Sequence, residues 1–200
     1  MFKWVNSPIS LLVAGFLLTT LVGSYINHSF HTESWRSKAR FEIFKERLKE
    51  ATEAQSSIIV LSNRRIILLE RILGELTSNR LQSARDIWKE YFEFVNEWNR
   101  NVKSNNNRLS LLFGDMVSRS FLDNGEIEAQ QPKSLHYIFR QAHIAVLNVI
   151  ECMKRNCEDA EREQLMLAAR AKLDTLGFAH DEFAIRLRTV LKQKEEELLL

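Results

Sequence analysis

The sequence predicts an all-α protein in which an N-terminal transmembrane helix precedes a long-helix, up-down antiparallel four-helix-bundle-like domain. Three observations support this. The 200 residues include only 6 Gly and 2 Pro, the two residues that most often interrupt helices. An uncharged, apolar run lies near the N-terminus. The rest of the chain carries apolar residues at alternating steps of three and four, the spacing of one face of an α-helix.

The uncharged run, residues 8–26, is close to the length that crosses a hydrocarbon core of about 30 Å. Trp4 and Tyr25 flank it, where amphipathic aromatic side chains settle at the membrane surface. A cleaved signal peptide with Lys3 as its charged n-region is the alternative, but the run is long for a signal core. We therefore expect a short tail at 1–7, a single-pass signal-anchor helix and a juxtamembrane connector at 27–33.

The sidedness of the domain follows from two opposing signals. The positive-inside rule favours the cytoplasm, because the C-terminal flank of the run carries Arg36, Lys38, Arg40 and Lys45. A short tail with one lysine before the first apolar run is the usual start of an exported chain, and a cysteine pair favours an oxidising compartment. We expect a bacterial inner-membrane protein with a periplasmic, extracytoplasmic domain, and the cytoplasmic placement stays open.

Residues 34–196 form the predicted bundle, with residues 197–200 as a frayed tail. The first two helices are expected at 34–76 and 79–122. Asn79 and Gln82 resemble a capping box at the start of the second helix. The weak helix formers at 104–107 indicate a kink or a break within it. Asp123-Asn124-Gly125 is a turn signal that ends it.

The third and fourth helices are expected at 132–152 and 158–195. Pro132 suits the first position of a helix, and the acidic pair at 158–159 suits a helix N-terminus. The first two helices are about twice as long as the third. Part of the first hairpin should therefore lack a partner within one chain, and a second subunit or another protein would cover it.

Cys152 and Cys157 are the only cysteines. On one continuous helix their side chains would point too far apart to bond, but across a helix-to-helix turn they could form a disulfide. The alternative is two unrelated thiols. The spacing excludes a CxxC redox pair, and a zinc site would need two further ligands.

Five further residues are candidate interaction or ligand positions. Arg65 and His180 fall on apolar stripes, where a buried polar group can line a ligand site between helices. The plainer readings are a surface position for Arg65 and a core histidine bonded to a neighbouring helix for His180. Trp88, Tyr91 and Trp98 belong to a dense aromatic segment that either faces a partner or forms the thickest core layer.

No catalytic, metal or cofactor-binding motif is present in the sequence, so we expect a protein that is not an enzyme. The net charge is +2, and the basic residues are not concentrated into a patch, which argues against binding to nucleic acid. The sequence favours a membrane-anchored, non-catalytic protein acting by protein–protein interaction or assembly. Its partners would be the bilayer, through 8–26, and a protein or a second copy. The alternatives are a small-molecule-sensing ectodomain of a membrane complex and, more remotely, an unrecognised enzyme.

Overall fold

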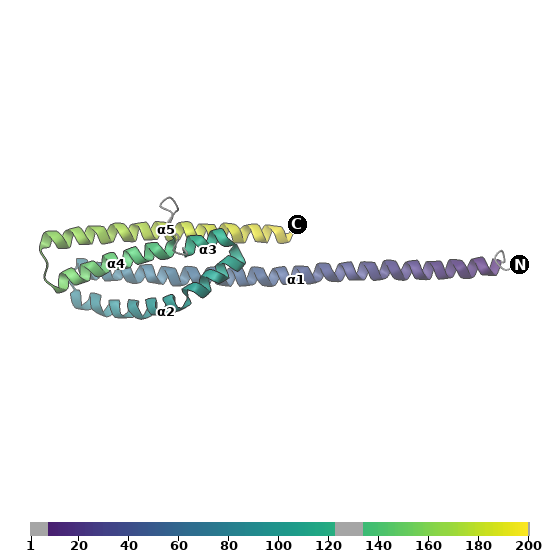
Figure 1. The fold of residues 1–200 in the computed structure, drawn as a ribbon, viewed down its shortest axis with the longest axis horizontal. Coiled ribbons are helices and arrows are strands. Elements are labelled where there is room, and N and C mark those ends of the chain that lie inside the picture. Colours follow the sequence, from purple (N-terminus) through teal and green to yellow (C-terminus); the bar gives the residue numbers. More distant parts are fainter. Residues whose placement is uncertain (1–7, 123–133, 200) are drawn as a thin grey trace. The chain divides into compact units, whose positions relative to one another are not determined.

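The computed structural model describes the backbone of residues 8–122 and 134–199, and the side chains of Thr20, Ser24, 35–122 and 134–197. Every described element is a helix, which confirms the all-α prediction. The elements, labelled in Figure 1, are α1 (Pro8–Thr77), α2 (Leu81–Phe113), α3 (Asp115–Phe121), α4 (Leu135–Lys154) and α5 (Asp159–Leu199). The chain divides into two units, Met1–Glu46 and Arg47–Leu200, and each is described by itself.

The first unit contains the N-terminal half of α1. The predicted connector at 27–33 is part of this continuous helix. Trp35, Phe41 and Ile43 are exposed on it. Trp4 and the side chain of Tyr25, predicted to flank a membrane span, lie outside the described residues. Among the parts that are described, no helix is long and apolar enough to cross a membrane, and the span predicted at 8–26 stays a prediction from sequence.

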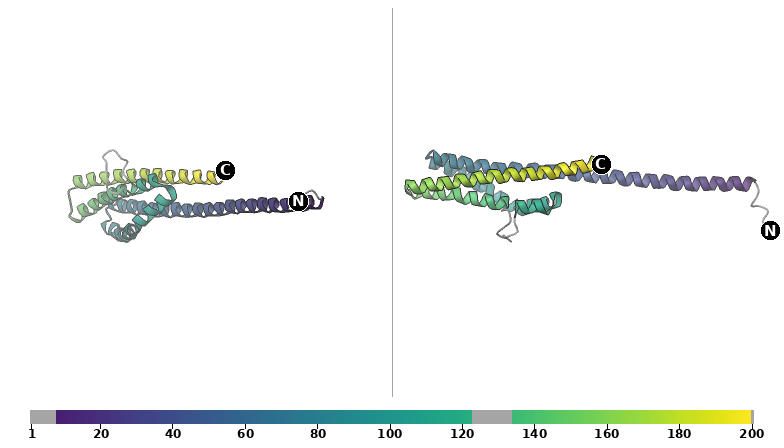
Figure 2. Two further views of the ribbon diagram at one scale, coloured as in Figure 1. Left: turned by 45° about the vertical axis from the view of Figure 1, so that its right-hand side comes forward. Right: turned by 90° about the horizontal axis from the view of Figure 1, so that it is seen from above.

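The second unit packs the C-terminal half of α1 and the other four helices around one apolar core. Helices α4 and α5 lie side by side along the length of α4, as both views in Figure 2 show. Helix α3 fills the space between α2, α4 and α5. The largest fully buried side chains come from all five helices: Ile58, Leu68, Leu69, Ile72, Leu73, Tyr91, Leu109, Phe121, Phe139, Ile150, Leu176 and Leu187.

The turn between α1 and α2 differs from the prediction. Asn79 has a positive φ of 57° and ends α1, and it does not cap α2. The Asn79 amide donates to the carbonyl of Leu76 (3.0 Å) and the Arg80 amide to that of Glu75 (2.9 Å). These are the two hydrogen bonds of a Schellman motif, whose left-handed position suits Asn. The predicted capping box with Gln82 is therefore wrong, and α2 begins without a side-chain cap.

The predicted helix at 79–122 is two helices. No break occurs at 104–107, because the apolar positions on either side, Val102 and Leu109, are buried and hold the helical register. The interruption falls at Gly114, whose φ of 87° only glycine adopts without strain. The turn predicted at 123–125 lies outside the described residues.

The remaining helix ends differ by a few residues from those expected. Helix α4 begins at Leu135, where the Ser134 hydroxyl accepts the Tyr137 amide (3.2 Å), and Pro132 lies outside the described residues. The tail expected to fray at 197–200 is helical as far as Leu199. Helix α5 runs without interruption through Gly177.

Candidate functional site

Arg65, on α1, lies inside the core with 3% of its surface exposed. Its guanidinium carbon is 4.5 Å from the centre of the Phe139 ring, on α4. The same carbon is 6.0 Å from the ring centre of Tyr91 and 5.9 Å from that of Trp98, both on α2. The reading of Arg65 as a surface residue is therefore wrong. We call Arg65 and the rings of Trp88, Tyr91, Trp98, Phe139 and His143 the aromatic layer.

The Arg65 guanidinium is only partly satisfied by its surroundings. Its Nε donates to the Tyr91 hydroxyl oxygen at 3.4 Å, while its Nη1 is buried without a hydrogen-bond partner. No carboxylate among the described side chains forms an ion pair with it. Aromatic faces attract a cation but replace only part of the lost hydration. The layer thus holds a positive charge that its neighbours only partly satisfy.

Tyr91 connects Arg65 to His143, on α4. The hydroxyl oxygen of Tyr91 accepts a hydrogen bond from Arg65 and lies 3.2 Å from Nδ1 of His143. The Tyr91 hydroxyl can therefore donate its proton to Nδ1 when the imidazole is neutral. Burial raises the pKa of Tyr91, an effect that the Arg65 charge opposes. Burial, and then the charge of Arg65, lower the pKa of His143. Both side chains are therefore held in their neutral forms.

The rest of the aromatic segment mostly joins the same core. Trp98 contacts the rings of Phe121 and Phe139, with ring centres 5.8 Å and 6.0 Å away. Trp88 is half-buried against His143, at 5.0 Å. Phe92 instead points outward and is 50% exposed. Most of the segment is thus part of the core, where its rings contact side chains of α3 and α4. The sequence did not single out Phe139 and His143, because a single ring on a stripe resembles any other core position.

His180 is buried on α5 but belongs to a different environment. Its Nδ1 lies 3.5 Å from a carboxylate oxygen of Asp181, its neighbour on the same helix, so the bond expected to another helix is not found. Its Nε2 is buried without a hydrogen-bond partner. No described contact joins His180 to Arg65, so the two predicted ligand positions do not form one site.

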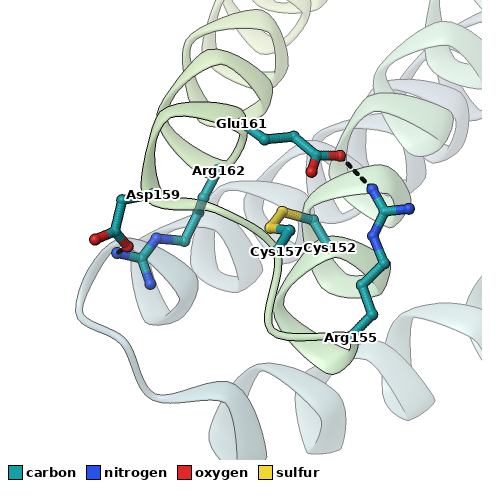
Figure 3. Close-up of a disulfide and its surroundings, with 6 residues drawn as sticks. All are labelled: Cys152, Arg155, Cys157, Asp159, Glu161 and Arg162. Atoms are coloured by element: carbon teal, nitrogen blue, oxygen red, sulfur yellow. Dashed lines mark hydrogen bonds and ion pairs between the residues drawn. A yellow bond between two sulfur atoms is a disulfide. The ribbon is translucent and has the colours of Figure 1, made fainter.

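The turn between α4 and α5 carries the cysteine pair, shown in Figure 3. Cys152 and Cys157 form a disulfide, with Cα atoms 5.2 Å apart. Asn156, with a φ of 51°, closes α4, and the Cys157 amide donates to the Cys152 carbonyl (3.1 Å). This is the second Schellman motif of the bundle, and the disulfide joins the two positions where such motifs often place an apolar contact.

The first Schellman motif places a different pair at the same two positions. There Glu75 and Arg80 form an ion pair, with Nε 2.8 Å from a carboxylate oxygen. The α4–α5 turn adds a charged group above its sulfurs, since Arg155 pairs with Glu161 on the first turn of α5. Cys157 and Glu161 are solvent-accessible, whereas Cys152 is buried. The second turn therefore brings two sulfurs and a carboxylate together, whereas the first turn has an ion pair at the equivalent positions.

We expect the stability of the protein to fall as the pH drops below the usual histidine pKa of 6.5, partly because of His143. Its pKa is lowered in the folded state, so in that range the unfolded chain binds a proton that the folded chain does not. Thermal unfolding of the wild type and of His143→Gln should be compared between pH 7.5 and pH 5. The wild type should lose more stability on acidification. Equal losses would contradict a neutral, buried His143.

Comparison with known proteins adds no family to these observations. No family model matches the sequence, and neither a curated protein nor a solved structure matches it.

Proposed function

We propose that this chain is a membrane-anchored, non-catalytic helical-bundle protein that assembles with a second copy through the outer face of α5. The observation that carries the proposal is a line of three exposed apolar side chains on that helix. Leu167 is 66% exposed, Phe178 is 71% exposed and Ile185 is 60% exposed. Isolated exposed apolar residues are ordinary, but three large ones on one face of a helix point to an interaction surface.

The position of this line on α5 distinguishes it from the core stripe. Its members are eleven and seven residues apart, which correspond to about three and about two helical turns. They therefore share one face, and we call this line the α5 outer stripe. The buried residues of the helix recur on the opposite face: Ala169, Leu173, Leu176, His180, Phe183, Leu187 and Leu191. One face of α5 serves the bundle, and the other exposes these three apolar side chains together with charged residues such as Asp174.

The charges along the α5 outer stripe favour a second copy in antiparallel orientation. If Leu167 of one copy faces Ile185 of the other, Arg170 lies opposite Asp181 and Glu163 lies opposite Arg188. All four charged residues are exposed and lie along one flank of the stripe. In an antiparallel pair, equivalent flanks meet, and two-fold symmetry makes each contact occur twice. A parallel pair would not bring these opposite charges together.

A charge exchange tests this register. We expect Arg170→Glu and Asp181→Arg each to weaken self-association of the full chain in mild detergent, because each places like charges opposite each other twice. The double variant should restore association to within a few-fold of the wild type. Sedimentation at several concentrations measures this. Single variants that associate like the wild type, or a double variant weaker than both, would refute the antiparallel register.

The membrane anchor in this proposal rests on the sequence of residues 8–26. If it spans a bilayer, the full chain should stay with membranes during alkaline carbonate extraction. Replacing Leu17 and Leu18 by Arg should release the chain, since each charge costs roughly 2.5–3.5 kcal/mol at a bilayer centre.

Labelling Cys152 and Cys157 with a membrane-impermeant maleimide, after reduction by an impermeant reductant, reports on which side of the membrane the domain lies. Labelling without permeabilisation places the domain outside the cytoplasm.

A second candidate function, sensing a small anionic molecule, is favoured by the buried Nη1 of Arg65. A ligand carboxylate between α1 and α2 would supply the hydrogen bond and the charge that the aromatic layer lacks. The test is a thermal-shift screen of small carboxylates against the wild type and Arg65→Met. A stabilising carboxylate that loses its effect in the variant would support this function. A panel without effect on the wild type would count against it.

A further inference from the structure

Three possible metal-ligand atoms converge at the turn between α4 and α5. The sulfurs of Cys152 and Cys157 and a carboxylate oxygen of Glu161 lie within 4.8 Å of one another. No other such group of three His, Cys, Asp or Glu side chains occurs among the side chains that the structure describes. Thiolate sulfur and carboxylate oxygen are both zinc ligands. Of the two further ligands that a zinc site at this cysteine pair needs, Glu161 supplies one, and water would take the fourth position.

The backbone of the turn fixes this arrangement independently of the sulfur–sulfur bond. The Schellman motif around Asn156 holds the two cysteine Cα atoms 5.2 Å apart through the Cys157-to-Cys152 backbone hydrogen bond. In a tetrahedral site with zinc–sulfur bonds of about 2.3 Å, the two sulfurs stand roughly 3.7 Å apart. Rotation of the cysteine side chains achieves this separation without moving the backbone. Reduction would therefore leave both sulfurs above the same turn.

We propose that the α4–α5 turn is a redox-gated zinc site, in which reduced Cys152 and Cys157, together with Glu161, bind one Zn²⁺. The reductant is a dithiol, such as that of a thiol–disulfide oxidoreductase, which supplies two electrons and two protons. The sulfurs of the dithiol form a disulfide, and the bond between Cys152 and Cys157 is reduced to two thiols. Binding Zn²⁺ then releases the two thiol protons to water. Oxidation by a disulfide re-forms the Cys152–Cys157 bond, yields two thiolates on the oxidant and releases the metal.

Arg155 competes with the metal for Glu161. Its guanidinium pairs with this carboxylate and holds it over the sulfurs in Figure 3. Zinc binding must break or share this ion pair, because the cation and the metal use the same carboxylate. Loss of the Arg155 charge should therefore strengthen metal binding, whereas a purely structural Arg155–Glu161 pair would make no such prediction.

The test uses Co²⁺ as a spectroscopic probe with the full chain in mild detergent, reduced by a phosphine. We expect one Co²⁺ per chain, with the near-ultraviolet absorption of cobalt–thiolate bonds, and displacement by one equivalent of Zn²⁺. The oxidised protein should show none of this absorption. Cys152→Ser should remove most of it. Glu161→Gln should weaken binding by about 10-fold or more, since even outer groups of metal sites commonly contribute that much.

Two matched variants separate a built site from adventitious thiol binding. Glu158→Gln changes an exposed carboxylate on the same turn that is outside the cluster, and it should bind Co²⁺ like the wild type. Arg155→Gln should bind several-fold more tightly. Circular dichroism confirms that each variant keeps its helices. The proposal is overturned if the reduced wild type takes up no Co²⁺ or if Glu161→Gln binds as tightly as the wild type.

Discussion

Phe178→Glu should convert the assembled protein to single copies over the concentration range in which the wild type is paired. Phe178 is the most exposed member of the α5 outer stripe and lies between Leu167 and Ile185. In the register with Leu167 facing Ile185, position 178 is level with Asp174 of the other copy, so a glutamate there sets two carboxylates against each other in place of an apolar ring, and symmetry repeats this in both copies. At about 2 kcal/mol per copy, the dissociation constant should rise roughly 1,000-fold. Sedimentation in mild detergent measures it.

The control for this variant is Leu111→Glu, on α2. Leu111 is 84% exposed, so its replacement adds the same charge to the surface without touching α5. We expect it to associate like the wild type, and both variants should keep the wild-type helix content. If Phe178→Glu pairs as tightly as Leu111→Glu, the α5 outer stripe is not the interface. If both dissociate, the loss reflects added charge in general.

Phe139→Ala should be among the most destabilising single substitutions in the bundle. The Phe139 side chain is fully buried, and its ring lies under the Arg65 guanidinium. Truncating a buried phenylalanine costs about 3–5 kcal/mol, and exposing the cation to an empty space removes a further contact. For a chain of this length, this corresponds to a fall in Tm of roughly 10 °C or more. Thermal unfolding followed by circular dichroism measures it.

Phe92→Ala is the matched control, because it removes the same side chain from a half-exposed position on α2. Its Tm should change by no more than a few degrees. A second comparison isolates the charge: Arg65→Met fills similar volume without a buried cation and should leave stability unchanged or raise it. If Phe139→Ala is as mild as Phe92→Ala, the aromatic layer does not stabilise the bundle.

The helices themselves could be predicted because they depend on local periodicity. The apolar steps of three and four along α2 and α5 correspond to the residues that are buried, including Tyr91, Trp98 and Leu187. The boundaries of the helices were harder to predict, because the same residue type, Asn, occurs both at the start and at the end of helices. Asn79 and Asn156 both end helices in the left-handed conformation. In sequence, the first resembles a start signal for the next helix.

The sites depended on long-range packing, which sequence periodicity does not specify. Arg65 was identified by its stripe position, but it is buried by rings such as Trp98 and Phe139, which lie on other helices, far along the chain. The Cys152–Cys157 spacing allowed a disulfide only across a turn, and Asn156 supplies that turn. The α5 outer stripe was obscured because Leu167, Phe178 and Ile185 are outnumbered on their helix by the residues of the core face.

The most direct test of the central claim is the mass of the purified full chain in mild detergent, measured by light scattering over a range of concentrations. Self-assembly through α5 predicts a two-copy particle that separates into single copies on dilution. The Arg170→Glu variant should separate at a higher protein concentration than the wild type. A particle that remains a single copy at every concentration would contradict the claim.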